Sequence, residues 1–164
     1  MAGAKDVAVR VGKEFGKRFG REYGLFDPYR LDDADVAIVI LNSAAGTTKV
    51  AVDELRAKGV KVGVLRPRLF RPFPFSEIAE ALKGCKAVAV LDRADSMNGF
   101  GGPVFNEVRS ALYDLDRRPK IISRIYGLGG RDYKVKDALE VFSELGKIAQ
   151  SGQVDTLQKY ITMG

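Results

Sequence analysis

The chain has 164 residues, 46% hydrophobic and 29% charged, which suits a single globular domain of ordinary core size. It has no histidine and one cysteine, Cys85, so the commonest general base, an internal disulfide and CxxC metal or iron–sulfur sites are all excluded. The net charge of +6 favours anionic partners.

The first 24 residues predict a helix with two parallel stripes. Apolar residues recur every four positions, at Val7, Val11, Phe15, Phe19 and Tyr23, beside a row of glycines at 12, 16, 20 and 24. Each interior glycine costs about 1 kcal/mol relative to alanine, which close approach of another backbone would offset. We expect the glycines and part of the apolar stripe to face another domain or subunit. The predicted interface residues here are Phe15, Gly16, Phe19 and Gly20.

A stripe of period four winds by about 40° per step around a helix of 3.6 residues per turn, so one straight neighbour cannot cover it all. The isolated chain is therefore expected to self-associate or to fray at this helix.

Buried strands alternate with amphipathic helices after residue 34. The strands are predicted at 35–41, 61–65, 86–91 and 120–126, and the helices at 46–59, 74–84, 102–115 and 134–150. This alternation predicts an α/β fold, an open and mostly parallel sheet flanked by helices on both faces. We divide the chain into an N-terminal helix and linker (1–33), an α/β domain (34–150) and a C-terminal extension (151–164).

The loop "NSAAGTT" (42–48) follows the first strand and opens a helix. In an open parallel sheet ligands bind at the carboxyl ends of the strands. The amides of Gly46, Thr47 and Thr48 are therefore the predicted anion-binding site, because a helix start attracts phosphate or carboxylate groups. The loop matches neither GxGxxG nor the P-loop pattern, so a turn capped by one of the threonines is the alternative.

The loop "RPRLFRPFP" (66–74) is stiffened by three prolines and alternates arginines with large apolar side chains. This makeup is typical of an interface anchor, and Arg68, Phe70 and Arg71 are the predicted contacts. A solvated loop and ligand-binding arginines are the alternatives.

Asp92 ends the third strand, where a catalytic acid could stand. Because Arg93 follows it, an ion pair or a cap is the simpler role. No set of residues has a recognisable catalytic or metal-binding spacing. Cys85, at the entry to a strand, is expected to be a small core residue.

The loop "YGLGGRD" (126–132) has three glycines, which permit positive φ. A tight strand-to-helix turn is favoured, with Asp132 as a cap for the next helix and an anion site as the lesser alternative. Gly129, Gly130 and Arg131 of this loop are also predicted interface residues.

Basic residues concentrate in 117–136, with seven basic side chains against one acidic. No RNA-binding or helix-turn-helix pattern accompanies them, so nucleic acid is not expected as a partner. No apolar run approaches the roughly 20 residues of a membrane helix, and the N-terminus lacks the apolar centre of a signal peptide. The sequence predicts a cytoplasmic protein without a membrane partner.

The succession "KRFGREYG", "NSAAGTTK", "RPRLFRPFP", "AVLDR", "GGPVFNEVRSALY" and "YGLGGRD" resembles the C-terminal part of the α subunit of pyruvate:ferredoxin oxidoreductase, or pyruvate synthase. The resemblance covers essentially the whole chain, and "RLFRPFP" followed by "GLGGRD" is its most specific part. Relatives acting on branched-chain 2-oxoacids look much alike. Asn42 departs from an expected glycine, but asparagine also tolerates left-handed geometry.

The resemblance implies a transketolase C-terminal-like domain, to which an antiparallel edge strand can be added. It also implies a complex that oxidatively decarboxylates pyruvate to acetyl-CoA and reduces ferredoxin, using thiamine diphosphate, magnesium, iron–sulfur clusters and CoA. The chain lacks the GDG…N diphosphate motif and a cysteine set. It is therefore expected to bind none of these cofactors and to have no catalytic residues of its own.

The expected role is that of a structural and subunit-interaction domain. Its partners would be the N-terminal part of the α subunit, other oxidoreductase subunits and, indirectly, ferredoxin. The alternatives are the same role in a branched-chain 2-oxoacid oxidoreductase, or a stand-alone anion- or nucleotide-binding module built on residues 42–48 and 127–130.

Overall fold

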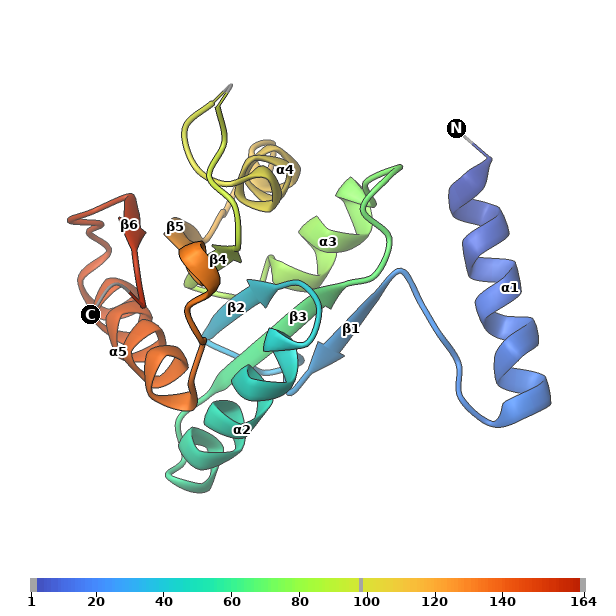
Figure 1. The fold of residues 1–164 in the computed structure, drawn as a ribbon, viewed down its shortest axis with the longest axis horizontal. Coiled ribbons are helices and arrows are strands. Elements are labelled where there is room, and N and C mark those ends of the chain that lie inside the picture. Colours follow the sequence, from blue (N-terminus) through green and yellow to red (C-terminus); the bar gives the residue numbers. More distant parts are fainter. Residues whose placement is uncertain (1–2, 98, 163–164) are drawn as a thin grey trace.

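The computed structural model describes residues 3–97 and 99–162, which form a six-stranded sheet with helices on both faces (Figure 1). The strands are β1 (Phe26–Tyr29), β2 (Val36–Ile40), β3 (Val62–Pro67), β4 (Ala87–Asp92), β5 (Lys120–Ile125) and β6 (Gln158–Tyr160). The helices are α1 (Ala4–Phe19), α2 (Ala44–Ala57), α3 (Phe75–Leu82), α4 (Pro103–Leu112) and α5 (Val135–Ser151), with a 3-10 turn η1 (Leu128–Gly130).

The strand order is β1-β3-β2-β4-β5-β6, and all neighbours are parallel except β1, which runs antiparallel to β3. The predicted open, mostly parallel sheet is thereby confirmed. β2 lies between β3 and β4. After β2 the chain adds β3 on one side of it and then β4 on the other. The loops after β2 and β4 therefore diverge at the carboxyl edge of the sheet.

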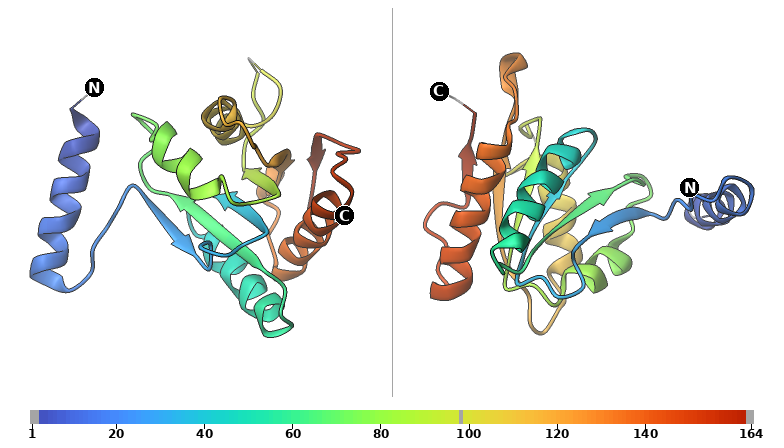
Figure 2. Two further views of the ribbon diagram at one scale, coloured as in Figure 1. Left: turned by 180° about the vertical axis from the view of Figure 1, so that it is seen from behind. Right: turned by 90° about the horizontal axis from the view of Figure 1, so that it is seen from below.

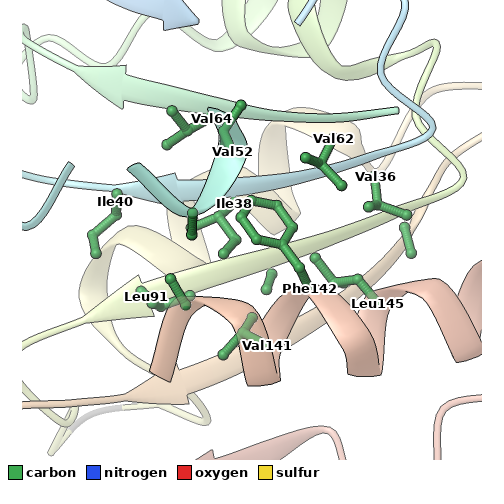
Figure 3. Close-up of a cluster of buried hydrophobic side chains, with 14 of the residues drawn as sticks. Val36, Ile38, Ile40, Val52, Val62, Val64, Leu91, Val141, Phe142 and Leu145 are labelled. Carbon is green, nitrogen blue, oxygen red and sulfur yellow. The ribbon is translucent and has the colours of Figure 1, made fainter. Parts of the chain in front are cut away.

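Each face of the sheet has its own apolar core. On one face α2 and α5 cover β2, β3 and β4, and Figure 3 shows Val52, Phe142 and Leu145 from these helices meeting the strand side chains. On the other face α3 and α4 bury Ile78, Leu82 and Phe105 against the sheet. Every residue of β2 and β4 is buried, as the continuous apolar runs predicted.

Two strands were not predicted from the sequence. β1 lies in the segment assigned to the linker, and β6 lies in the C-terminal extension. β1 contains Asp27 and Pro28, residue types depleted in strands, and an edge position is where proline is tolerated. β1 agrees with the antiparallel edge strand that the family resemblance implied.

β6 is held by a buried arginine in addition to its backbone pairing with β5. Arg124 of β5 is fully buried, and its guanidinium pairs with Glu144 of α5. The same group donates to the carbonyls of Thr156 and Leu157, at 3.2 and 3.3 Å. Arg124 therefore fastens the segment before β6 to the sheet and to α5.

α1 stands apart from the two helical layers, at the end of an extended linker (Figures 1 and 2). Its contacts with the domain include an ion pair of 2.8 Å between Lys5 and Glu77 of α3. Among the described residues, no helix has the length and apolar character needed to cross a membrane.

Candidate functional site

An open cleft of about 580 Å³ lies at the carboxyl edge of the sheet, where the loops after β2 and β4 diverge. This is the position at which open α/β sheets bind ligands, and the volume suits a small molecule. Its lining includes Asn42, Ser43, Thr47, Phe70, Asp92, Arg93, Tyr126, Arg131, Asp132 and Tyr133. The cleft therefore brings together parts of all four loops considered in the sequence.

The predicted anion-binding residues lie inside α2 rather than before it. The helix begins at Ala44, two residues earlier than expected, so neither threonine is its N-cap. The amide of Gly46 donates to the carbonyl of Ser43 at 2.9 Å. The hydroxyl of Thr48 is buried and donates to the carbonyl of Ala44 at 3.0 Å. Of the predicted set, Thr47 lines the cleft, together with the turn that precedes the helix.

Asn42 occupies that turn with a φ of 59°, the left-handed geometry that asparagine tolerates at low cost. Its departure from the family's glycine therefore leaves the turn intact.

Asp92 caps a helix. Its two carboxylate oxygens accept hydrogen bonds from the amides of Val104 and Phe105, at 2.9 and 3.0 Å, in the first turn of α4. Burial raises the pKa of Asp92, while these two amides pull it in the opposite direction. Gly102 gives the carboxylate room, because a Cβ there would lie 2.3 Å from Asp92. Of the roles considered from the sequence, the cap is confirmed.

The glycine-rich loop after β5 is a tight strand-to-helix turn, as favoured from the sequence. Gly127, Gly129 and Gly130 have φ between 67° and 78°, values that side chains with a Cβ rarely adopt. The amide of Gly127 donates to the hydroxyl of Thr162 at 3.1 Å. Arg131 donates to the carbonyl of Leu128 at 3.2 Å, within the loop itself.

The cap of α5 was predicted wrongly. The helix starts at Val135, and the carboxylate of Asp137 accepts from the amide of Lys134 at 2.7 Å. Asp137, not Asp132, therefore stabilises this helix start, and Asp132 lines the cleft instead.

The arginines of the loop after β3 are engaged within the chain. Arg66 and Arg68 approach the carboxylate of Asp27 on β1, at 3.0 and 3.8 Å, and Arg71 pairs with Glu107 on α4 at 2.6 Å. The guanidinium of Arg71 also lies 4.1 Å from the centre of the Phe70 ring. The loop is thus pinned to both β1 and α4.

Lys49 of α2 joins the same carboxylate at 2.9 Å. Burial opposes ionisation of Asp27, but the hydrogen bond from Lys49 and the charges of Lys49, Arg66 and Arg68 outweigh it and lower its pKa. No sequence pattern indicated this cation cluster, because Asp27 lies in an unpredicted strand and Lys49 is distant along the chain.

The glycine stripe of α1 is met by a second backbone, as the sequence predicted, but that backbone is the chain's own linker. A Cβ on Gly12 would lie 1.9 Å from the carbonyl oxygen of Tyr23, and one on Gly16 would lie 3.0 Å from Glu22. Gly20 is the left-handed C-cap of the helix, with φ 71°. The close backbone at Gly12 and Gly16 is therefore that of Tyr23 and Glu22, and contact of Gly16 and Gly20 with another subunit stays a prediction.

The apolar stripe beside those glycines remains open. Phe15 packs on the rings of Phe19 and Tyr23, with centroids 4.5 and 5.4 Å away, yet Phe19 is 61% exposed. Val7 and Val11 are about half exposed. Contact of this stripe with a partner stays a prediction.

The fold and the cleft define an open, mostly parallel α/β domain with a ligand-sized cleft at its carboxyl edge. The structure superposes on a 2-oxoglutarate:ferredoxin oxidoreductase from Magnetococcus marinus with a TM-score of 0.55 and 19% identity, over 81% of this chain and 21% of that one. It superposes on a split-gene transketolase with a TM-score of 0.56 and 16% identity, over 75% of this chain and 42% of that one. At these identities the likeness concerns the fold.

The sequence comparisons give the family. Residues 34–138 match the model of pyruvate:ferredoxin oxidoreductase core domain II. The chain is 45% identical over 144 residues to pyruvate synthase subunit PorA of Thermotoga maritima, covering 88% of this chain and 36% of the relative. It is 44% identical over 153 residues to ketoisovalerate oxidoreductase subunit VorA of Pyrococcus horikoshii, covering 93% and 39%. The chain belongs to the pyruvate:ferredoxin oxidoreductase core domain II family, and it spans under two fifths of these relatives' length.

Proposed function

We propose that this chain is a structural and subunit-interaction domain of a pyruvate:ferredoxin oxidoreductase α subunit. The complex would oxidatively decarboxylate pyruvate to acetyl-CoA and reduce ferredoxin. The observation that carries the interaction role is α1, which stands off the domain with Phe19 61% exposed and Val11 51% exposed. A helix with an uncovered apolar stripe is a typical docking element. The predicted partners are the N-terminal part of the α subunit, other subunits and, indirectly, ferredoxin.

The side chains described here do not fit the metal centres of such a complex. Iron–sulfur clusters take several thiolates, whereas Cys85 is buried and its pKa is raised to about 11. Within residues 3–97 and 99–162, no three His, Cys, Asp or Glu side chains gather as a metal site requires. We therefore place the iron–sulfur clusters on other parts of the parent complex, and thiamine diphosphate, magnesium and CoA stay expectations for that complex from the family resemblance. A cytoplasmic location remains a prediction from the sequence.

In this role the chain's own residues order the loops around α1 and the carboxyl edge. Asp92 fixes the start of α4, and α4 holds Arg71 through Glu107. Asp27 fixes the other end of the same loop through Arg66 and Arg68. The surface beside α1 is therefore rigid before a partner arrives, which lowers the entropic cost of association.

Reconstitution tests the proposal. The remaining polypeptides of the complex are produced without this chain, and pyruvate-dependent ferredoxin reduction is measured before and after it is added. We expect activity only in the mixture and none from the chain alone. Turnover by the isolated chain, or activity indifferent to its addition, would contradict the proposal.

The same role on a branched-chain 2-oxoacid is a second candidate. It is favoured by the identity of 44% to the ketoisovalerate enzyme subunit, next to 45% for the pyruvate synthase subunit. Substituting ketoisovalerate for pyruvate in the reconstituted assay separates the two, because the preferred substrate gives the higher kcat/KM.

A stand-alone anion- or nucleotide-binding module is the third candidate, and the cleft favours it. Arg93 and Arg131 line the cleft beside the turn that opens α2, where Thr47 also contributes. Calorimetry with CoA, thiamine diphosphate and nucleotides tests this use. Heat of binding that is lost in Arg131→Gln supports it, and absence of heat from all of these compounds rejects it.

A further inference from the structure

A groove of about 330 Å³ opens between α1, the linker and the loop after β3. Its apolar lining includes Val11, Phe15, Tyr23, Leu25 and Leu69, and Arg68 stands at its rim. Val11 is 51% exposed and Tyr23 is 39% exposed. The groove is thus an apolar surface that the rest of the described chain leaves open.

A cluster of three cations adjoins the groove through Arg68, which lines it, and the cluster holds more positive charge than its one carboxylate neutralises. Lys49, Arg66 and Arg68 all approach one oxygen of the Asp27 carboxylate, which leaves two of the three cationic charges uncompensated within the cluster. The Nε of Arg66 is buried and has no hydrogen-bond partner among the described residues. Arg68 connects the cluster to the groove, because its guanidinium lies 4.6 Å from the centre of the Tyr23 ring.

We propose that this groove binds an acidic, amphipathic segment of another polypeptide of the oxidoreductase, a partner assignment that rests on the proposed function. An apolar side chain of that segment enters the groove beside Val11, and its carboxylate pairs with Arg68 and Lys49. The partner's acid is attracted by the uncompensated charge at the rim. Burial of Val11 and Tyr23 supplies the affinity.

Neither the chain's own linker nor a second copy fits the groove as well. The linker already forms one wall of the groove, where Tyr23 lies against Gly12, so it does not also occupy the open space. A second copy would bring the same cation cluster to the rim and a net charge of +6, so like charges would face each other. Charge complementarity therefore selects an acidic partner.

The test measures Kd of the full chain for the remaining polypeptides of the complex, at low and at high salt. Lys49→Gln removes a rim cation, and we expect Kd to rise about two- to fivefold with a shallower salt dependence. Val11→Ser removes an apolar contact, and we expect a rise of about fivefold with the salt dependence unchanged. Val11 lies on α1, outside both cores, so Val11→Ser should leave the fold intact. It therefore keeps the proposal testable if Lys49→Gln does not fold.

Two matched controls isolate the groove. Lys147→Gln removes an exposed cation of α5. This helix lies at the end of the sheet away from α1 (Figure 1). Val50→Ser removes a valine of α2 that is 49% exposed, close to the 51% of Val11. We expect both controls to bind as the wild type does.

The outcomes separate the two proposals. Weaker binding in both groove variants, with unchanged controls, supports the acidic segment. Wild-type binding that neither groove variant alters overturns it and leaves the subunit role standing. Absence of wild-type binding refutes the subunit role and the groove together. A self-associated chain that Val11→Ser dissociates, with partner binding unaltered, would make a second copy the occupant and refute the acidic partner.

Discussion

Replacing Gly12 with alanine should release the linker from α1. A Cβ at Gly12 would lie 1.9 Å from the carbonyl oxygen of Tyr23, whereas Cβ contacts below 3.0 Å essentially never occur. The linker must therefore retreat by more than an ångström. The obstacle is backbone, so no rotation of a side chain can relieve it.

Two effects of the substitution oppose each other. Alanine favours the helical state by about 1 kcal/mol over glycine in a helix interior. Displacing the linker exposes Gly12 and disturbs the stacking of Arg68 on Tyr23, at 4.6 Å. We expect α1 to keep its helicity while the linker loses its fixed position.

Amide hydrogen exchange measures both effects, at residues 4–19 for the helix and at Arg68 and Leu69 for the linker, because these two amides donate to the carbonyl of Leu25 at 2.9 and 3.0 Å. In Gly12→Ala the amides of Arg68 and Leu69 should exchange about fivefold to tenfold faster, as loss of about 1 kcal/mol of local packing gives. The matched control is Gly146→Ala in α5, where a Cβ meets nothing within 4 Å. That control should raise the free energy of unfolding by about 0.5–1 kcal/mol. Unchanged exchange at Arg68 and Leu69 in Gly12→Ala would refute the close contact between the linker and α1.

Three further substitutions test the contacts that order the domain. Asp92→Ala leaves two helix-start amides without acceptors, so urea titration should show a loss of about 2–4 kcal/mol, with a smaller loss for Asp92→Asn. Arg124 makes five hydrogen bonds, to both oxygens of Glu144 and to the carbonyls of Ser123, Thr156 and Leu157, whereas lysine has three donors. For Arg124→Lys we expect a loss of about 2 kcal/mol and faster exchange at Ile161, and unaltered exchange there would argue against the clamp. Asp27→Asn should cost about 1 kcal/mol at neutral pH. The pKa of Asp27 is lowered on folding, so its stabilisation is present above the ordinary value of 3.8 and is lost as pH falls through the folded value; the two proteins should converge there.

The central strands and the flanking helices could be predicted from the sequence because apolar runs and amphipathic patterns agreed on one α/β fold. Continuous apolar runs identified β2 and β4, since strands covered on both faces contain little else. β1 and β6 were not predicted because short edge strands need no apolar pattern. β6 also depends on Arg124, which lies 34 positions before Gln158. No local signal reports such a contact.

The contacts around the cleft and α1 were harder to predict, because they too join residues that are distant in the sequence. For Asp92 the sequence left an ion pair and a cap open beside a catalytic role, and the bonds from the amides of Val104 and Phe105 identify the cap. Asp27 and Lys49 could not be placed together, because β1 had first to be recognised and paired with β3. The glycines of α1 predicted a close backbone, but their spacing could not say that residues 22–24 turn back to supply it.

Pro28 limits how a partner can approach the exposed side of β1. The strand has four residues at the margin of the sheet, and proline contributes no N–H to an added strand. A neighbouring polypeptide therefore finds a poor template for continuing the sheet, and the same holds for aggregation through this margin. Recognition on this side is left to side chains, so its specificity can change by single substitutions without altering the sheet.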